Sequence, residues 1–483
     1  MLLGTLLQGV EYTGEAPEAL EINDVTADSR KACRGGLFVC IAGAGADGHD
    51  YAPVAAQAGC VAIVAERLTA AELPHILVKN PRLAYALICA NFFGNPAESL
   101  RLVGVTGTNG KTTTTFILKH ILEENGHKCG LIGTIRNMAG EEMLPARYTT
   151  PEPYELQRLF AEMVKHGCDY VVMEVSSQAL AQERVAGCRF VAGVFTNLTQ
   201  DHLDYHKTME NYFGAKLRLF DQSALAVINL DDEYAGRLIA AVPCRAITYS
   251  ARNMEADYTA RNIRYRVDGT DYDMVGLGVI GRVKLRIPGS FNVYNSLAAI
   301  SCAVSLGLPL QGVLDAVRSA AGVMGRLEVM PLPPELGFSV IIDYAHTPDG
   351  LKKTLAAVGG FKHGRVVCVF GCGGDRDKTK RPQMGAIAAS MADFVVVTSD
   401  NPRSEDPTTI INEILDGMKG SSTPMVSIEN RREAIEFAIR SAKKDDIILL
   451  AGKGHEDYQI LKTGKIHFDE REVVSEILAP MKE

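Results

Sequence analysis

A short glycine-rich segment between a strand-like run and a helix-like run constrains the fold of this chain more than any other feature. Residues 101–107 (RLVGVTG) are mainly apolar, and residues 112–126 (TTTTFILKHILEENG) form an amphipathic helical pattern. A strand that passes through such a loop into a helix directs backbone N–H groups and the helix dipole toward bound phosphate. The connecting sequence GTNGKT therefore predicts a nucleoside triphosphate site.

The residues of this loop have separate expected roles. Gly107 and Gly110 permit the backbone conformations that turn N–H groups toward phosphate, Lys111 is expected to reach the β- and γ-phosphates, and the Thr112 hydroxyl to ligate Mg²⁺. The general P-loop pattern has a glycine five places before Gly110, where this chain has Val105. A glycine-rich turn without a ligand is therefore the alternative interpretation.

Apolar strand-like runs alternate with helix-like runs both before and after the polar stretch 258–287, which predicts an antiparallel patch. The alternation indicates βαβ units and buried parallel sheets. A Gly- and Pro-containing linker near residue 97 suggests one domain boundary. The return of the strand–helix alternation after Gly325 suggests the other. We therefore expect an α/β protein with three domains: a small α/β domain (residues 1–97), a central P-loop domain with a doubly wound, mostly parallel sheet (98–324) and a Rossmann-like α/β domain (325–483).

Composition excludes several classes of protein. With 50 basic and 58 acidic residues the formal charge is −8, which does not fit a nucleic-acid-binding protein. The uncharged run 288–314 contains glycine, asparagine and proline, so it predicts a buried helix and no membrane insertion. The eleven cysteines are scattered and include no C-x-x-C pair, which favours reduced thiols. The first residues lack a signal-peptide pattern, which agrees with this expectation. We expect a cytoplasmic monomer.

Polar residues at the ends of two other strand-like runs are expected near the phosphate loop. Glu174 ends YVVMEVSS, and His202 and His206 follow GVFTNLTQ. Because ligands of doubly wound sheets bind at the carboxyl ends of the strands, Glu174 and His202 are expected to meet near Lys111 and hold a divalent cation. A hydrogen-bonded pair of loop histidines is the alternative.

Six motifs in this order, GTNGKT, MEVSS, TQDHLDYH, GSFNVYN, GRLE and DYAHTPDG, resemble those of the Mur ligase family. Members are ATP-dependent amide ligases of peptidoglycan precursor synthesis, and the short GTNGKT form is the family's own version. The sequence DNPR at 400–403 is similar to members that add meso-diaminopimelate to UDP-N-acetylmuramoyl-L-alanyl-D-glutamate. The resemblance therefore implies ATP and Mg²⁺ as cofactors, and these two compounds as substrates.

The resemblance also implies ligand roles for individual residues. The first domain would bind the uridine end through Ser29, Ala44, Gly45 and Ala46. The muramoyl-dipeptide would be held by Thr149, Thr150, Ser176, Gln182 and Arg184. The nucleotide would contact Gly107, Thr108, Asn109, Gly110, Lys111, Thr112, Thr113, Asn292, Asn295, Asp343 and His346. From the residues alone, Arg184 reads equally as an arginine on a helix surface.

The catalytic and metal-binding residues implied by the resemblance overlap. The expected catalytic residues are Lys111, His202, Lys216 and Arg326. The expected metal-binding residues are Thr112, Glu174, His202 and Lys216. In the family the lysine that matches Lys216 is a carbamate that helps to hold a second Mg²⁺, which requires a neutral amine and hence a lowered pKa. Taken alone, it is a lysine on a helix, whose ordinary role is a solvated charge.

Selectivity for the incoming amino acid is expected from the third domain. Diaminopimelate differs from lysine by one carboxylate, so a discriminating site should hold a cation, and Arg403 and Arg376 are the candidates. Glu456 is suited to an ammonium group, and Gly452 allows close backbone approach. Asp400, Asn401 and Pro402 complete the expected set. An internal Asp400–Arg403 ion pair is the alternative.

Other functions remain open at this stage. A lysine-adding ligase is the nearest variant, and a folylpolyglutamate synthetase or a D-alanyl-D-alanine-adding ligase is a more distant one. A regulatory P-loop GTPase would need the guanine signature N-K-x-D, which the sequence lacks. Phosphate release that depends on both the UDP-dipeptide and diaminopimelate would exclude a switch.

Overall fold

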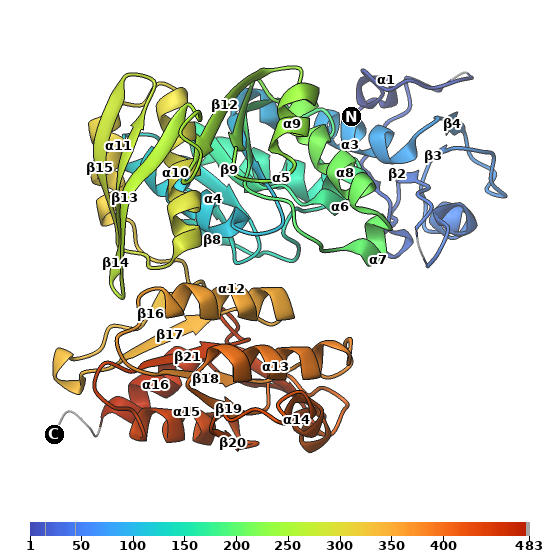
Figure 1. Cartoon of the computed structure of the whole chain (residues 1–483). Coiled ribbons are helices and arrows are strands. Elements are labelled where there is room, and N and C mark those ends of the chain that lie inside the picture. Colours follow the sequence, from blue (N-terminus) through green and yellow to red (C-terminus); the bar gives the residue numbers. More distant parts are fainter. Residues whose placement is uncertain (15, 44, 480–483) are drawn as a thin grey trace. The chain divides into compact units, whose positions relative to one another are not determined.

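The computed structural model describes residues 1–14, 16–43 and 45–479. The chain divides into two compact units, which consist of Met1–Thr259 with Leu297–Val313, and of Ala260–Ser296 with Leu314–Glu483. Figure 1 labels the elements of both units. In the described part of the chain, no helix combines the length and the apolar character that crossing a membrane requires.

The N-terminal part of the first unit is a four-stranded parallel sheet in sequential order. Its strands are β1 (Asp24–Thr26), β2 (Gly36–Val39), β3 (Ala62–Ala65) and β4 (His75–Leu77), with the helices α1 (Leu3–Leu6), α2 (Ala52–Gln57) and α3 (Pro81–Phe92). Two apolar clusters hold the sheet: one includes Leu6 and Ile88 from α1 and α3, and the other includes Ala55 from α2. This part is therefore an α/β layer structure, as expected.

The larger sheet of the first unit runs in the order β8-β7-β6-β9-β5-β10-β11-β12. Strands from β6 to β12 in this order pair in parallel, and β7 and β8 pair antiparallel. Their bounds are β5 (Arg101–Thr106), β6 (Cys129–Ile132), β7 (Asn137–Ala139), β8 (Glu142–Leu144), β9 (Tyr170–Glu174), β10 (Phe190–Phe195), β11 (Leu225–Asn229) and β12 (Arg245–Ser250). The mostly parallel sheet confirms the predicted βαβ organisation.

Helices pack closely against this sheet. They are α4 (Lys111–Glu124), α5 (Pro153–Lys165), α6 (Ser177–Ala181), α7 (Leu203–His206), α8 (Met209–Asp221) and α9 (Ala235–Ala241). A Cβ atom on Gly104 of β5 would lie 2.8 Å from Leu219 Cδ1 of α8 and 3.1 Å from the ring of Phe190. The glycine in RLVGVTG therefore lets α8 approach the central strand.

Strand β13 (Tyr258–Arg266) carries the chain from the first unit into the second. It is followed by β14 (Gly269–Gly276) and β15 (Val279–Leu285), which pair antiparallel, so the predicted antiparallel patch is confirmed. The uncharged run forms α10 (Ser290–Ser305), most of whose residues are buried, and α11 (Leu310–Ser319) follows. The expectation of a buried helix in this run is confirmed.

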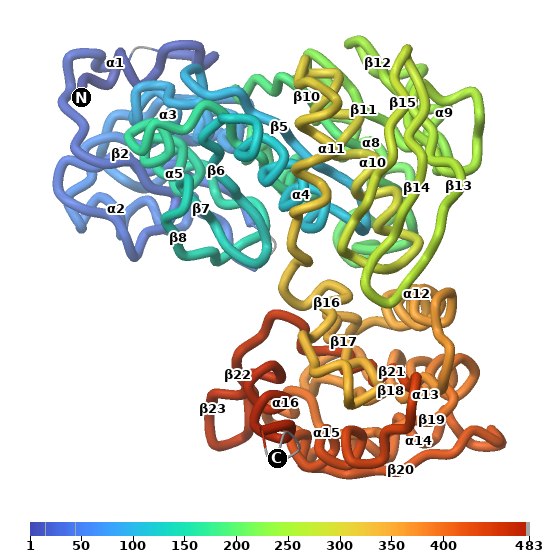
Figure 2. The backbone as a smooth tube through the Cα atoms, turned by 90° about the vertical axis from the view of Figure 1, so that its left-hand side faces the viewer, coloured from blue at the N-terminus to red at the C-terminus, as the bar shows by residue number. Residues whose placement is uncertain are grey.

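The second unit contains a six-stranded sheet in the order β16-β17-β21-β18-β19-β20, parallel except for β16. Its strands are β16 (Glu328–Val329), β17 (Ser339–Asp343), β18 (Val366–Phe370), β19 (Phe394–Val397), β20 (Met425–Ser427) and β21 (Ile447–Ala451). The helices are α12 (Pro348–Gly359), α13 (Lys380–Met391), α14 (Pro407–Asp416), α15 (Arg431–Arg440) and α16 (Glu470–Leu478). A hairpin of β22 (Tyr458–Leu461) and β23 (Gly464–His467) lies beside α16 (Figure 2).

Two apolar clusters show that helices cover both faces of this sheet. One cluster joins inward residues of α12, α13 and α14 to alternate residues of β18 and β21, such as Cys368 and Leu449. The other joins α15 and α16 to the intervening residues of the same strands, such as Val369 and Leu450. Alternate residues of a strand point to opposite faces. The arrangement is the doubly wound sheet predicted from the sequence.

A fully buried ion pair joins the ends of two of these strands. Arg431, the first residue of α15, donates from Nε to Glu470 Oε1 at 2.8 Å. Its Nη1 donates to the carbonyl of Ser399 at 3.3 Å, and its Nη2 to the carbonyl of Ala451 at 2.9 Å. These carbonyls lie at the carboxyl ends of β19 and β21, which flank β18. Arg431 thus connects two loops across a strand.

Arg431→Met should lower the free energy of unfolding by about 3–5 kcal/mol, because it leaves the Glu470 carboxylate buried without its partner. The neighbouring Arg432 is half-exposed and pairs at the surface with Glu476, so Arg432→Met should change it by about 0–1 kcal/mol. Urea denaturation of both variants measures the difference. Equal destabilisation by the two substitutions would contradict this role of the buried pair.

Candidate functional site

The phosphate loop lies between β5 and α4, as the sequence predicts. Gly107 and Gly110 have φ angles of +149° and +87°, which residues with a side chain rarely adopt. A Cβ atom on Gly107 would lie 1.9 Å from the Thr196 hydroxyl oxygen. The helix begins directly at Lys111, and Thr112 and Thr113 are buried in its first turn. The loop therefore has the backbone that brings helix N–H groups close to an anion.

The end of β10 supports this loop through residues that sequence reasoning missed. Asn197 accepts from Thr108 N at its carbonyl (2.8 Å) and from Asn109 N at Oδ1 (3.0 Å). Its Nδ2 donates to the Asn109 carbonyl at 3.0 Å, and Thr196 Oγ1 donates to the same carbonyl at 2.6 Å. Thr196 and Asn197 directly follow the strand FVAGVF, and this position could have identified them as candidate site residues.

The Lys111 ammonium folds back over its own loop. Its Nζ donates to the carbonyls of Gly107 at 2.8 Å and Thr108 at 2.9 Å. The positive charge therefore lies at the mouth of the glycine-rich turn. A cation at this position can meet phosphate oxygens that approach the loop.

Glu174 ends β9 beside the loop strand, since it pairs in register with Val105. Its carboxylate is buried and accepts from Thr134 at both oxygens, from the backbone N (2.9 Å) and from the hydroxyl (3.1 Å). The Thr134 hydroxyl also contacts that of Thr149 at 3.0 Å. The Thr134 hydroxyl thus links Glu174 to Thr149, which the sequence assigns to substrate binding.

The five residues expected to hold the muramoyl-dipeptide form one network with Glu174. Thr150 Oγ1 donates to the Glu174 carbonyl at 2.9 Å and accepts from Ser176 N at 3.0 Å. Arg184 donates to the Thr150 carbonyl at 2.8 Å and to Gln182 Oε1 at 2.8 and 3.1 Å. The interpretation of Arg184 as an arginine on the surface is therefore wrong, because its side chain is mostly buried.

Lys216 is buried within α8, against the ring of Tyr212. Its Nζ lies 4.6 Å from the centre of that ring, and the Tyr212 hydroxyl is 3.2 Å from Thr108 Oγ1 of the phosphate loop. Burial, together with the charge of Lys111, lowers the pKa of Lys216 well below its usual value. Desolvation penalises the ammonium form relative to the neutral amine. The interpretation of Lys216 as a solvated charge is wrong.

The two histidines after β10 have different surroundings. The His206 ring is buried, stacks on Tyr212 at 5.0 Å and has Nε2 2.9 Å from the Ser177 hydroxyl. Burial and the Lys216 charge lower its pKa. His202 is half-exposed, with Nε2 3.6 Å from Asp201 Oδ2 and its ring 6.3 Å from Tyr212. Tyr212 thus adjoins both histidines, and no sequence pattern marks it as part of the site.

In the second unit, Arg326, Asp343 and His346 belong to one cluster. Asp343 is buried and accepts from Leu327 N (2.8 Å), Ala345 N (3.0 Å) and the Thr354 hydroxyl (3.0 Å). Burial raises the pKa of Asp343. Its bonds fix the backbone on both sides of the cluster, next to Arg326 on one side and His346 on the other.

Aromatic rings lie between Arg326 and His346. The Arg326 guanidinium carbon lies 5.1 Å from the centre of the Tyr344 ring, which is 4.5 Å from His346 and 4.8 Å from His455. Burial and the charges of Arg326 and Arg471 lower the pKa of His455 to about 4. At neutral pH this imidazole is therefore uncharged. His455 was missed, although it directly precedes Glu456, a residue predicted from the sequence.

Asn292 and Asn295 are both buried on α10, one turn apart. Asn292 Nδ2 donates to the carbonyl of Pro288 at 2.7 Å, and Asn295 Nδ2 donates to Asn292 Oδ1 at 2.9 Å. Their amide groups thus form a short chain that begins at the start of the helix.

The predicted uridine-binding residues lie in the N-terminal sheet region. Ser29 follows Asp28, whose side chain caps a short 3₁₀ turn. Gly45 and Ala46 are exposed, and the carbonyl of Ala46 accepts from Gly43 N at 2.9 Å. Ala44 lies outside the described residues.

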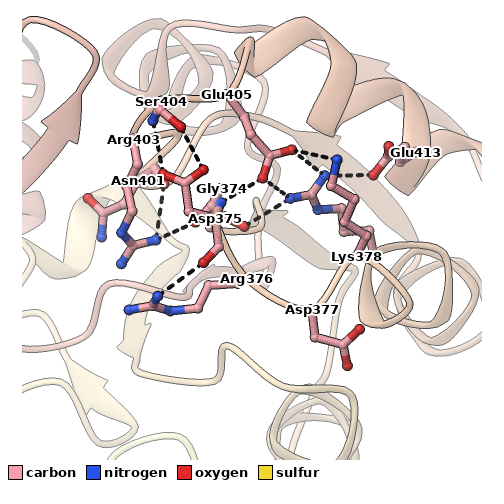
Figure 3. Close-up of polar contacts among 12 residues, drawn as sticks. Gly374, Asp375, Arg376, Asp377, Lys378, Asn401, Arg403, Ser404, Glu405 and Glu413 are labelled. Atoms are coloured by element: carbon pink, nitrogen blue, oxygen red, sulfur yellow. Dashed lines mark hydrogen bonds and ion pairs between the residues drawn. The ribbon is translucent and has the colours of Figure 1, made fainter. Parts of the chain in front are cut away.

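Arg403 and Arg376 lie close together in the loops that follow β19 and β18. Arg403 Nη1 donates to the Gly374 carbonyl at 2.8 Å, and Arg376 donates to the Asp375 carbonyl at 3.1 Å. Both side chains lie within 4 Å of the position of a Cβ atom on Gly373. Figure 3 shows their guanidinium groups on one side of the turn, opposite Glu405 and Glu413.

Among the described residues, Arg403 forms no ion pair, so the alternative of an Asp400–Arg403 ion pair is wrong. Asp375 is the carboxylate nearby: hydrogen bonds from Ser404 and, more weakly, the Arg403 charge lower its pKa. Asp400 instead lies beside Gly452, where a Cβ atom would be 2.6 Å from Oδ2. The carbonyl of Pro402 would be 1.9 Å from a Cβ atom on Gly374. The loops that follow β18 and β19 therefore pack directly against each other. Because Asp400 does not pair with Arg403, the Arg403 charge stays available for a ligand.

Asn401 and Glu456 are joined by a hydrogen bond of 2.9 Å between Nδ2 and Oε2. The buried ammonium group of Lys453 lies 3.2 Å from Asn401 Oδ1 and 3.2 Å from Glu456 Oε2. Sequence reasoning chose Asn401 and Glu456 and missed Lys453. The structure thus joins the two predicted loops through these three side chains.

Three family models match successive parts of the chain. They are the "Mur ligase family, catalytic domain" at residues 21–93, the "Mur ligase middle domain" at 105–303 and the "Mur ligase, glutamate ligase domain" at 325–454. A relative from Clostridium acetobutylicum, named UDP-N-acetylmuramoyl-L-alanyl-D-glutamate--2,6-diaminopimelate ligase 1, is 48% identical over 95% of each chain. The chain belongs to the Mur ligase family.

Another relative and two solved structures are similar over most or all of the chain. A relative of the same name from Caldanaerobacter subterraneus is 47% identical over 99% of each chain. A solved structure of a UDP-N-acetylmuramoyl-L-alanyl-D-glutamate--2,6-diaminopimelate ligase has a TM-score of 0.76 at 31% identity and covers 100% of this chain and 99% of its own. A folylpolyglutamate synthase from Mycobacterium tuberculosis has a TM-score of 0.62 at 19% identity, covering 77% of this chain and 93% of its own, and shows the shared fold.

Gly107→Ala should weaken binding of a non-hydrolysable ATP analogue by about tenfold, because the added Cβ atom collides with Thr196 in a backbone conformation that alanine avoids. Isothermal titration calorimetry measures the dissociation constant. Gly126 is the matched control, since its φ is +88° and a Cβ atom there would meet nothing within 4 Å. An unchanged affinity in Gly107→Ala, with weaker binding in Gly126→Ala, would contradict the assigned loop.

Proposed function

We propose that this Mur ligase adds meso-diaminopimelate to the D-glutamyl γ-carboxylate of UDP-N-acetylmuramoyl-L-alanyl-D-glutamate and converts ATP to ADP and phosphate. The names of its relatives support this assignment. The observation that carries it is the Arg403 guanidinium, which donates to a backbone carbonyl, forms no ion pair among the described residues and so suits the extra carboxylate of diaminopimelate. The product is a precursor of peptidoglycan.

The reaction has two steps. The γ-carboxylate attacks the terminal phosphorus of ATP, which gives an acyl phosphate and ADP; the amino group of diaminopimelate then attacks the acyl carbon, and phosphate leaves. The carboxylate and the triphosphate repel each other, so positive charge must be placed between them. Lys111 supplies this charge at the glycine-rich turn, and Arg326 is proposed to supply a second charge.

Mg²⁺ would further neutralise the phosphates. The described residues contain no cluster of three or more His, Cys, Asp or Glu side chains that could hold a metal ion. This fits Mg²⁺, which usually takes one or two carboxylates and completes its coordination with phosphate oxygens and water. We assign Thr112, Glu174, His202 and the Lys216 carbamate as the protein groups near it. The lowered pKa of Lys216 supports the carbamate.

The remaining roles follow the two networks of side chains. Thr149, Thr150, Ser176, Gln182 and Arg184 are proposed to bind the muramoyl-dipeptide, and Ser29, Gly45 and Ala46 the uridine end. The nucleotide is proposed to contact Asn292, Asn295, Asp343 and His346 as well as the phosphate loop. We further propose a cytoplasmic monomer with domains 1–97, 98–324 and 325–483, the limits that the sequence suggests.

An amino-acid panel in an ATP-coupled ligation assay tests the function directly. With the UDP-dipeptide present, meso-diaminopimelate should be the preferred acceptor over lysine. Preferred use of lysine would instead identify the lysine-adding activity, and phosphate release without an amide product from any amino acid of the panel would refute amide ligation.

Arg403→Ala should lower kcat/KM for diaminopimelate by about 100-fold or more and reduce its preference over lysine, because the ligand carboxylate loses a charged partner. The KM for ATP should not change. Arg432→Ala, which removes another arginine of the same unit, is the control. Undiminished discrimination against lysine in Arg403→Ala would contradict the assignment.

Lys216→Ala should abolish ligation, and a small carboxylic acid should restore part of the activity by replacing the carbamate. Steady-state rates with and without added acetate measure the rescue. Lys119→Ala removes a second buried lysine of the same unit, one that is paired with Glu123, and should not respond to acetate. Full activity of Lys216→Ala without acetate would exclude the carbamate.

A further inference from the structure

A fully buried lysine lies between the loops that follow β19 and β21. Lys453 is 0% exposed, and its Nζ lies 3.2 Å from both Asn401 Oδ1 and Glu456 Oε2. Asn401 Nδ2 also donates to Glu456 Oε2, at 2.9 Å, and Ile460 N donates to Asn401 Oδ1 at 2.9 Å. One oxygen of the Glu456 carboxylate therefore receives two donors, and these hydrogen bonds restrict the orientation of the carboxylate.

The burial of Lys453 makes this arrangement rigid. A buried ammonium group is stable only when partners replace its lost hydration. Among the described residues, its charged partner is Glu456, and the Tyr458 ring lies 5.7 Å from its Nζ. Any rotation of the Glu456 carboxylate away from Lys453 would leave the lysine charge uncompensated. Lys453 therefore restrains Glu456 more than a hydrogen bond between neutral groups would.

The charges around this group favour the binding of one cation. Asp400 and Arg431 both approach the position of a Cβ atom on Gly452, at 2.6 Å and 4.0 Å, and Arg431 pairs with Glu470. With Lys453 and Glu456, three carboxylates thus accompany two cations. Arg403, which donates to the Asn401 carbonyl at 3.4 Å, adds a third cation, whose charge the far carboxylate of the ligand would balance. One negative charge then remains, which an ammonium group of the ligand can balance.

We propose that Lys453 is a positioning residue that directs Glu456 toward the second, non-reacting amino group of the amino-acid substrate and so selects for that group. The proposal rests on the proposed function and deepens it. Two separate devices then recognise the far end of diaminopimelate: Arg403 and Arg376 bind its carboxylate, and the Lys453–Asn401–Glu456 group binds its ammonium. Each device can be removed without the other, because among the described residues Arg403 contacts the second group at the backbone carbonyl of Asn401 (3.4 Å), which no side-chain substitution removes.

Two analogues separate these devices. α-Aminopimelate keeps the far carboxylate and lacks the far amino group, whereas lysine keeps the amino group and lacks the carboxylate. In Lys453→Met the preference for diaminopimelate over α-aminopimelate, measured as the ratio of kcat/KM values, should fall about tenfold or more, while the preference over lysine remains. The KM values for ATP and the UDP-dipeptide should not change. Lys462→Met, at an exposed lysine of the same unit, is the control.

Arg403→Ala should give the opposite pattern, with lower preference over lysine and unchanged preference over α-aminopimelate. If folded Lys453→Met retains the wild-type preference over α-aminopimelate, the ion pair is only structural and the proposal is overturned. The same holds if both preferences fall equally.

A double variant keeps the test decisive if Lys453→Met does not fold. Lys453→Met with Glu456→Gln removes both charges, so neither remains buried and unpaired. If Lys453 acts through Glu456, this variant and Glu456→Gln alone should show the same preference over α-aminopimelate. A further loss in the double variant would overturn the proposal. Failure of the wild-type protein to use diaminopimelate would refute the proposed function instead, before any variant is compared.

Discussion

Buried parallel strands place their carboxyl ends along one edge of a sheet, and nearly every candidate residue of this protein depends on that constraint. The phosphate loop follows β5, Glu174 ends β9, and Thr196 and Asn197 follow β10. In the second unit, Asp343 ends β17, and the loops with Arg403 and Glu456 follow β19 and β21. Strand interiors supply the buried apolar layers, so variation in chemistry is confined to these ends.

Desolvated cations are the second feature common to both units. Lys216 has an aromatic neighbour and a lowered pKa, which favours its neutral form. Lys453 and Arg431 instead keep a carboxylate beside them. The same physical cost thus has two outcomes: a lowered pKa at Lys216, which makes the amine more nucleophilic, and pairing at the other two, which holds loops in place.

The parts of the site that lie in continuous motifs could be predicted from the sequence, because a strand, a glycine-rich turn and a helix follow one another in the chain. The doubly wound sheets, the antiparallel patch and the buried α10 were predictable for the same reason, since periodicity is local. Tyr212, Lys453 and His455 were missed as members of the site. Their roles arise from contacts over long sequence separations, such as that between Lys453 and Asn401, which no local pattern encodes.

The connection that Arg431 makes between Ser399 and Ala451 has a consequence for ligand recognition. Because one rigid guanidinium is bonded to both backbones, a displacement of one loop would break a hydrogen bond to Arg431. The two loops are therefore expected to move together and to keep their conformation before the ligand binds. An incoming amino acid therefore does not have to order either loop, and less of its contact energy is lost to conformational entropy. Tight selection can thus be achieved with few direct contacts.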